Sequence, residues 1–504
     1  MNEAADARVE LSRLRKISIL LVVILTSTLY GTTLLIVSTI LPQMQGTLSA
    51  SADEIAWVIT FNILATAIAT PMSGWLAARF GVRNVMVWSI TGFTVATFMC
   101  GIAGSLESLI LWRIVQGAFG APSTPLSQSI LLETFSRPRH GLVMGVYGFG
   151  VVIGPIIGPV LGGLMAELYT WRWAFYVLVP VGALSVLGLH LCLADHIRKR
   201  SARLDWTGFL ALAVALSCIQ LILSRGQRLD WFDSGEIIIE TVLAAVAMWM
   251  FVTHSLTSPA PFLNPKYLLD RNYSLGLILV TVYGMLNFTP MVLLPPLLRE
   301  HMGYTDLLIG VVVGSRGIGG AIGFLAAGFA SRLNPRISMM AGFGMLFAAG
   351  LWLMHVNLEV SVAALAANAC LQGIAIGAIW VPLTVATFAT LPPSALAETS
   401  AVFHLLRNLG SSFFIALCVA EIVRSTGMNY SRMAELITPF NELLSMPWVT
   451  GAWNVETTPG LASLSGEIAR QSAMVGYLNA FGMFTVACAV AMPLVLLVRA
   501  KRDE

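Results

Sequence analysis

The sequence predicts an all-α polytopic membrane protein. Fourteen separate apolar stretches, each of roughly the 20 residues that a helix needs to cross the hydrocarbon, fill most of the 504-residue chain. Only 11% of the residues are charged, against about 25% in a typical soluble domain. A water-soluble fold could not shield that much apolar surface, so soluble classes of protein are excluded.

The fourteen predicted helices follow one another with short connections. The first is too long for the core of a signal peptide and runs into Pro42 without a small-residue cleavage site, so we expect it to be retained. In chain order the predicted spans cover residues 17–41, 54–77, 84–103, 106–130, 141–166, 173–194, 206–224, 235–254, 272–297, 307–330, 336–355, 360–383, 398–423 and 473–498.

The basic residues predict the orientation of these helices. With the N-terminus inside, nineteen of the 29 Lys and Arg residues fall in cytoplasmic segments, including the linker His196–Arg203. Cytoplasmic loops carry such an excess. We therefore expect both termini in the cytoplasm, as an even number of spans requires. The net charge of +3 is then a topology signal and gives no indication of nucleic-acid binding.

The second half of the chain weakly repeats the first at an offset of about 255 residues, an internal symmetry that transporters show. Gln116-Gly117 in the fourth span matches Gln372-Gly373 in the twelfth. The alignment predicts two six-helix halves, residues 1–195 and 266–504. The basic linker and the seventh and eighth spans, residues 196–265, have no counterpart and form an insert.

One long external segment, residues 425–471, precedes the last span. It contains three prolines, and loops of this length are usually functional or disordered. We expect residues 465–471 to extend the last helix outward. Trp448 and Trp453 make the segment apolar, so we expect it to be covered by the membrane surface, by the external face of the protein or by a partner.

The cysteines and the nucleotide motifs argue against other chemistry. All six cysteines lie in predicted spans, with no CxxC spacing and no nearby His, so we expect neither disulfides nor a metal site. The chain has no GxxxxGK[ST] sequence, which disfavours pumping driven by ATP.

The sharpest motif is a row of glycines in the fifth span. Glycines at 150, 154, 158 and 162 repeat every four residues and therefore form one flat ridge along the helix. Such a ridge lets another helix approach closely, while Pro155 and Pro159 favour a bend. Short matches of this kind are usually ordinary membrane packing, but four in register with two prolines indicate a specialised helix.

This sequence resembles the fourteen-span drug:proton antiporters of the EmrB/QacA type in the major facilitator superfamily. The fifth span is similar to the antiporter signature, and Arg113-Ile-Val-Gln116-Gly117 to the helix 4 signature. Residues 171–175 and 403–410 resemble the drug-exporting family itself. From these motifs we assign conformational roles to Gly74, Arg79, Gly81 and Arg83 in the loop 2–3 signature, to Gly150, Gly154, Pro155, Gly158 and Gly162, and to Arg316.

The resemblance implies a major facilitator fold and a function. It implies a secondary transporter of the inner (plasma) membrane that exports amphiphilic drugs or toxic compounds in exchange for protons, by alternating access. No cofactor and no enzymatic activity are implied. In double-membraned bacteria such pumps pass the substrate to a periplasmic adaptor and an outer-membrane channel. A same-fold uniporter or importer of a specific metabolite, and a non-transporting membrane sensor, are the alternatives.

Departures from the family pattern concern the coupling ion. The loop 2–3 signature normally carries an acid where this chain has Ala78, and the first helix of these pumps usually has an Asp where this chain has Thr33. No Asp or Glu falls near the centre of a core span. The sequence therefore leaves the coupling ion and its site open.

Three arginines lie inside the predicted spans, where an ionisable residue usually faces a cavity or a partner. They could organise a substrate site or tie helices together through carbonyls. Aromatic and amide side chains near the midplane could line a cavity suited to flat amphiphiles or cations, although they could equally serve packing. The predicted cavity residues are Tyr30, Trp57, Phe61, Asn62, Arg113, Gln116, Tyr283, Asn287, Trp380, His404 and Arg407.

Overall fold

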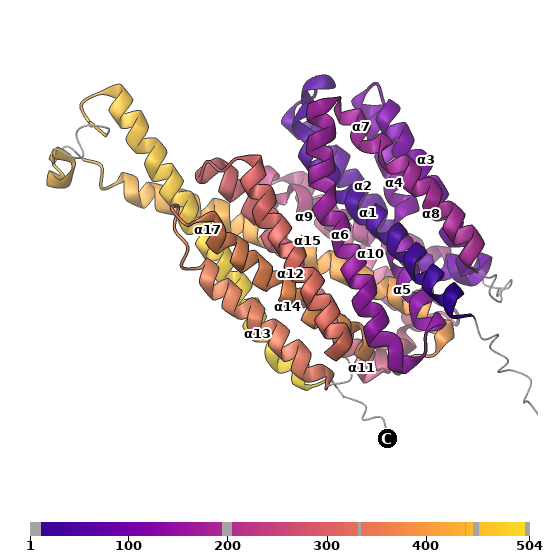
Figure 1. Ribbon diagram of the computed structural model, residues 1–504. Coiled ribbons are helices and arrows are strands. Elements are labelled where there is room, and N and C mark those ends of the chain that lie inside the picture. The colour runs from indigo at the N-terminus through magenta and orange to yellow at the C-terminus, as the bar shows by residue number, and fades with distance from the viewer. Residues whose placement is uncertain (1–11, 194–203, 331–333, 439, 447–452, 499–504) are drawn as a thin grey trace, which may run out of the picture.

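The structure is a computed structural model that describes residues 12–193, 204–330, 334–438, 440–446 and 453–498. Within these residues every regular element is a helix, and Figure 1 shows the long helices running roughly side by side. The first half contains α1 Arg13–Thr47, α2 Ala52–Phe80, α3 Val82–Ile102, α4 Leu106–Gly120, α5 Ser123–Thr134, α6 His140–Leu168, α7 Trp171–Tyr176 and α8 Leu178–Cys192. The insert and second half contain α9 Trp206–Arg225, α10 Gly235–Thr257, α11 Arg271–Pro296, α12 Asp306–Ala330, α13 Pro335–Leu353, α14 Val362–Phe388, α15 Leu396–Ala434 and α17 Thr458–Leu496.

Among the described residues, thirteen helices are long and apolar enough to cross a membrane. The prediction of one continuous helix over residues 106–130 is wrong. The helix breaks between Gly120 and Ser123, giving α4 and α5, each too short alone to span. Pro122 and Pro125 explain the break, because proline removes a helical hydrogen bond and clashes with the preceding turn. Together the two pieces occupy the place of the predicted fourth span.

The predicted external loop at 425–471 is wrong at both ends, whereas the expected outward extension of the last helix over residues 465–471 is confirmed. Helix α15 continues to Ala434 and α17 begins at Thr458, so both project beyond their apolar cores. Polar contacts join the projecting parts: the hydroxyls of Tyr430 and Ser465 lie 2.9 Å apart, and Asn479 donates to Ser425 Oγ at 2.8 Å. We call the paired projections, residues 425–438 and 458–472, the arm. Trp448 lies outside the described residues.

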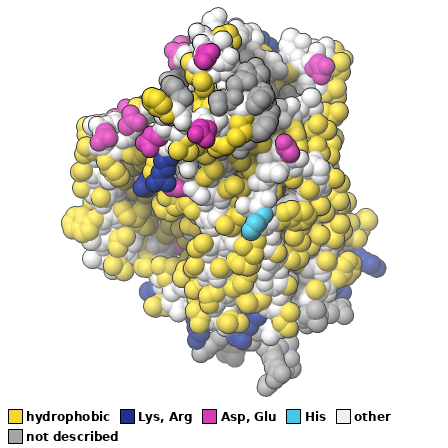
Figure 2. Space-filling view, turned by 90° about the vertical axis from the view of Figure 1, so that its left-hand side faces the viewer, with side chains coloured by type: hydrophobic (Ala, Val, Ile, Leu, Met, Phe, Trp, Pro, Cys, Tyr) yellow, Lys and Arg dark blue, Asp and Glu magenta, His cyan; other side chains and the backbone are white. Residues whose placement is uncertain are grey.

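The two chain ends define one end of the bundle, which we call the terminal end. Helix α1 begins there and α17 ends there (Figure 1). Arginines cap helices at this end: Arg83 donates to His190 O at 2.8 Å and Arg336 to Val498 O at 2.6 Å. Cations are favourable at helix C-termini. Figure 2 shows a hydrophobic belt with acidic side chains gathered toward the opposite end. The basic linker 196–203 lies outside the described residues.

The insert packs along the boundary between the halves. Helices α9 and α10 form a pair, and α9 also contacts α2 from the first half and α15 from the second. Asp205 fixes its start by accepting hydrogen bonds from Gly208 N at 3.0 Å and Phe262 N at 3.0 Å. His254 Nε2 lies 2.8 Å from the same carboxylate. One side chain therefore joins α9, α10 and the connection into the second half.

The halves are in close contact at the terminal end. A Cβ added to Gly74 of α2 would lie 2.6 Å from Glu398 Cα of α15, and one added to Gly145 of α6 would lie 2.6 Å from Phe324 O of α12. Ser400 donates to Pro125 O at 3.1 Å. The upper ends of the two halves diverge in Figure 1. The structure therefore shows a state that is closed at the terminal end.

Candidate functional site

In the first half, Arg113 of α4 is only 1% exposed and is held by polar groups from three helices. Its Nε donates to Val58 O of α2 at 3.2 Å, and its guanidinium also bonds the side chain of Gln116. Gln116 in turn donates to Thr97 Oγ1 of α3 at 2.7 Å. Asn62 of α2 donates to Arg113 O at 2.8 Å. Three predicted cavity residues thus form one buried network.

The second half repeats this arrangement with the arginine on a different helix. Arg316 of α12 donates to Gln372 Oε1 of α14 at 3.2 Å and also bonds Asn287 of α11. Gln372 donates onward to Asn368 Oδ1 at 2.7 Å. Gly373 packs on Arg316 as Gly117 packs on Asn62, so Arg316 and Asn62 occupy equivalent places. The internal repeat therefore extends to the buried polar contacts.

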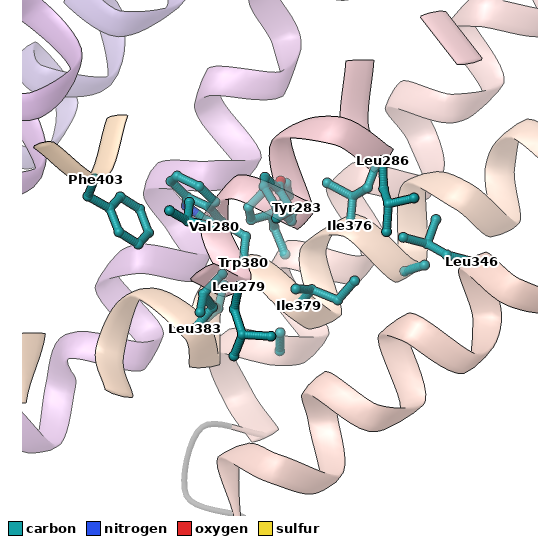
Figure 3. Close-up of a cluster of buried hydrophobic side chains, with 14 of the residues drawn as sticks. Leu279, Val280, Tyr283, Leu286, Leu346, Ile376, Ile379, Trp380, Leu383 and Phe403 are labelled. Carbon is teal, nitrogen blue, oxygen red and sulfur yellow. The ribbon is translucent and has the colours of Figure 1, made fainter. Parts of the chain in front are cut away.

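A cluster of aromatic rings includes Tyr283 of α11, Trp380 of α14 and Phe403 of α15 (Figure 3), and Arg407 of α15 lies against it. The Tyr283 and Trp380 rings lie 5.0 Å apart, and Trp380 and Phe403 lie 5.5 Å apart between centroids. The guanidinium carbon of Arg407 lies 5.5 Å from the centroid of Trp380 and 6.0 Å from that of Phe288. This geometry is a cation–π contact. The structure therefore brings Tyr283, Trp380 and Arg407 together.

His404 joins the halves where they meet at the terminal end. The side chain is 1% exposed, and its Nε2 lies 2.5 Å from Gln128 Oε1 of α5. Its Nδ1 and the Gln128 Nε2 are buried without a hydrogen-bond partner. Unsatisfied buried polar atoms cost free energy, so this contact has incomplete hydrogen bonding in the closed state. Gln128 was not among the predicted site residues, although a glutamine inside a predicted span was the signal that could have found it.

The glycine ridge of α6 lies directly on the backbone of α1. A Cβ added to Gly154 would lie 2.5 Å from Thr28 O, and one added to Gly158 would lie 2.8 Å from Thr32 O. Gly162 faces Ile36 one turn further along. Thr28 Oγ1 donates to Gly150 O at 2.9 Å, which bonds the two helices across the ridge. Both Pro155 and Pro159 stay within the continuous helix α6.

The residues of the loop 2–3 signature lie where α2 ends and α3 begins, at the terminal end of the bundle. Gly81 separates α2 from α3 with φ +86°, a conformation that glycine adopts without strain. Gly74 contacts Glu398, which also accepts a hydrogen bond from Asn264 N at 2.7 Å. Arg79 lies in the last turn of α2, where a cation complements the helix dipole. Glu398 was not among the predicted site residues; it is the first residue of the predicted span 398–423.

The remaining predicted cavity residues lie in different surroundings. Trp57 and Phe61 stack on each other at 5.0 Å, and Arg225 of the insert lies 4.6 Å over the Trp57 ring. Trp57 therefore faces α9. Tyr30 packs against Phe93 with centroids 6.0 Å apart and lies beside Gly120. Thr33, at the position where the family pattern has an acid, donates to Leu29 O of its own helix at 2.9 Å.

Known proteins are similar to this chain in sequence or in fold. The profile of the Major Facilitator Superfamily matches residues 22–415. The chain is 32% identical to the multidrug export protein EmrB of Escherichia coli (strain K12) over 404 residues, covering 80% of this chain and 79% of the relative. It is 30% identical to the multidrug export protein EmrB of Haemophilus influenzae over 441 residues, 86% of each. The crystal structure of the human organic anion transporter MFSD10 matches with a TM-score of 0.62 at 13% identity, over 94% of this chain and 99% of that chain, a likeness of fold alone.

Proposed function

Because the chain belongs to the Major Facilitator Superfamily and is a drug efflux transporter of the EmrB type, we propose that it works by proton antiport in the inner membrane. Efflux follows from the similarity to multidrug export proteins over most of the chain. The basic residues at the terminal end support a cytoplasmic position for both termini. On this assignment the terminal end is the cytoplasmic end, and the contacts there close the transporter toward the cytoplasm.

Alternating access in this chain involves the contacts at the terminal end. Opening toward the cytoplasm separates Gly74 from Glu398, Ser400 from Pro125 and His404 from Gln128. The α1–α6 contact lies within one half, and its backbone-to-backbone packing keeps that half rigid as it rocks. The single observation that carries the proposal is this closed seam between two pseudo-equivalent halves.

Proton coupling needs a titratable group, and the position of the usual acid holds Thr33. His404 lies in the seam between the halves, where its Nδ1 is buried without a hydrogen-bond partner. We assign proton binding to His404 on this ground. A uniporter is the second candidate, because no described carboxylate takes part in the hydrogen bonds of Arg113, Arg316 or Arg407.

Inverted membrane vesicles test coupled export. A fluorescent substrate should accumulate in vesicles that contain the protein when the interior is acidic, and addition of an ionophore that dissipates the pH gradient should release it. A His404→Gln variant keeps the size and polarity and should accumulate at least about tenfold less substrate, because proton transfer is lost. Equal accumulation with and without the gradient would support the uniporter instead.

We also propose that the arm binds a periplasmic adaptor. The arm projects at the end opposite the termini (Figure 1), and the described residues around its tip include Leu436, Phe440 and Leu443, which are 65%, 92% and 64% exposed. Apolar groups this exposed are favourable contacts for a partner.

The double change Phe440→Ser with Leu443→Ser should abolish co-purification with the adaptor. Leu269→Ser, at the terminal end and 87% exposed, is the control and should have no effect. Co-purification that survives the double change would place the adaptor elsewhere.

A further inference from the structure

We propose that this transporter binds its substrates as anions, with the guanidinium of Arg407 receiving the negatively charged group. The proposal deepens the proposed export function and rests on it. It assigns a chemical class of ligand, an aromatic or alkyl body with one carboxylate, sulfonate or comparable anionic group. It also assigns a specific residue of α15 to recognition.

The first observation is an uncompensated positive charge. Arg316 and Arg407 lie within helices long and apolar enough to cross a membrane. Arg113 lies in α4, which together with α5 occupies the place of the predicted fourth span. Among the described residues, the acceptors bonded to them are carbonyl and amide oxygens, and none is a carboxylate. A charge in the membrane interior is costly unless it is paired or solvated. Three such charges favour an anion over a cation in their neighbourhood.

The second observation separates Arg407 from the other two. Arg113 and Arg316 are 1% and 8% exposed, and each is bonded by groups from a neighbouring helix. Arg407 is partly exposed, and its described hydrogen-bond acceptor is Asn408, the next residue along the same helix. Its guanidinium is therefore not committed to holding two helices together. It has donors available for a ligand.

The third observation places Arg407 between the halves. One turn earlier on α15, His404 lies 2.5 Å from Gln128 of α5 in the first half, while the rings of Phe288 and Trp380 that lie against the guanidinium belong to the second. A ligand that reaches Arg407 therefore lies close to groups from both halves. Such a position allows one bound anion to contact both halves, which a substrate of an alternating-access transporter must do.

The aromatic rings support the same conclusion. The ring faces of Trp380 and Phe288 already carry the Arg407 cation. A second cation at these rings would meet electrostatic repulsion, so the expectation of a cation-binding aromatic cavity does not fit this geometry. An anion would instead pair with the guanidinium, whose planar donors match a carboxylate or sulfonate in a bidentate manner. Tyr283 and Trp380 would then contact the apolar body.

Two probes of matched size and shape but opposite charge test the proposal. Binding of tetraphenylborate and tetraphenylphosphonium to the purified full-length protein is measured by equilibrium dialysis. We expect the borate to bind at least about tenfold more tightly than the phosphonium. Arg407→Gln should remove this preference, whereas Arg407→Lys should keep it. Arg424→Gln, the same change at an exposed position of α15, is the matched control and should behave as the unmodified protein.

The outcomes are distinct. Equal binding of the two probes, tighter binding of the phosphonium, or a preference for the borate that survives in Arg407→Gln would overturn the proposal. If Arg407→Gln does not fold, competition for tetraphenylborate by benzoate but not by benzamide in the unmodified protein decides the same question, and equal competition by both overturns it.

A flux measurement separates this proposal from the proposed export. Inverted vesicles are incubated with anionic carboxyfluorescein or with cationic ethidium in the external medium, and uptake into the lumen is measured. Selective binding of the borate without flux of either dye would leave the anion site standing and contradict export. Accumulation of ethidium alone would contradict the anion site and leave export standing. Accumulation of carboxyfluorescein that is lost in Arg407→Gln would support both.

Discussion

At the residue scale, the close packing of α6 on α1 depends on glycines, which have no side chain to keep the two helices apart. The ridge at Gly150, Gly154, Gly158 and Gly162 was predictable from spacing alone, because a four-residue repeat must lie on one face of a helix. Its partner α1 could not be predicted, since the sequence contains no marker of which helix accepts the ridge. The structure supplies that partner in Thr28, Thr32 and Ile36.

We predict that Gly154→Ala destabilises the protein by about 1–3 kcal/mol, the usual cost of inserting a methyl group into a packed core. The new Cβ would lie 2.5 Å from Thr28 O, which is backbone and cannot move aside. Gly163→Ala in the same helix is the matched control, because its Cβ would meet Thr39 at an ordinary 3.8 Å. Thermal unfolding and dye export should both be impaired in the first variant only. Equal melting temperatures for the two variants would show that the ridge is not tightly packed.

The buried arginines were also visible in the sequence, but their roles were not. Arg113 and Arg316 hold helices together through amide and carbonyl oxygens, while Arg407 is the one that has donors to spare. Sequence spacing could not separate these cases, because the partners of Arg316 lie 29 and 56 residues away along the chain. The internal repeat identified Gln372 from the sequence, whereas its hydrogen bond with Arg316 could be found only in the structure.

At the element scale, the helical class and the apolar cores were predictable from hydropathy, and the ends of the helices were not. Hydropathy marks only the part of a helix that lies in lipid. The polar projections of α15 and α17 stay helical because they pair with each other, a tertiary effect that local composition does not carry. Pro122 and Pro125 signalled the break between α4 and α5. The length of the apolar run nevertheless led to the prediction of one continuous helix.

We predict that Asp205→Asn weakens the attachment of the insert, helices α9 and α10, to the rest of the protein and so lowers its stability. Burial raises the pKa of Asp205, but hydrogen bonds from Gly208 N, His254 and Phe262 N outweigh it, so the pKa lies below the usual aspartate range. An amide could still cap α9 but could not accept from both backbone amides, leaving a donor without a partner at a cost of about 1–3 kcal/mol. Thermal unfolding near neutral pH should show the loss.

The same substitution has a defined pH dependence. Because the pKa of Asp205 is lowered on folding, its contribution is present above the unfolded pKa and is lost as the pH falls through the folded value. The difference in stability between Asp205→Asn and the unmodified protein should therefore shrink in acid. Asp233→Asn, at an exposed position of the insert, should show no difference at any pH. A difference that grows on acidification would contradict the assigned role.

At the scale of the whole molecule, the internal repeat is the feature that connects sequence to mechanism. The offset predicted two equivalent sets of helices, and the structure repeats the Gln116 and Gln372 networks in both. The state of the transporter could not be predicted, because the same chain must be stable both closed and open at each end. Only the structure therefore shows that the two halves are in contact at the terminal end.

Cross-linking across this seam tests most directly whether its opening is part of export. A Cβ added to Gly320 of α12 would lie 3.2 Å from Val152 Cγ1 of α6, so cysteines at both positions should form a disulfide in the closed state. The double variant Val152→Cys with Gly320→Cys is made in a background in which the six native cysteines are replaced. Export is then measured as accumulation of a dye in inverted membrane vesicles. The account predicts that oxidation stops transport and that a reductant restores it, while each single-cysteine variant is unaffected. Full transport by the cross-linked protein would contradict it.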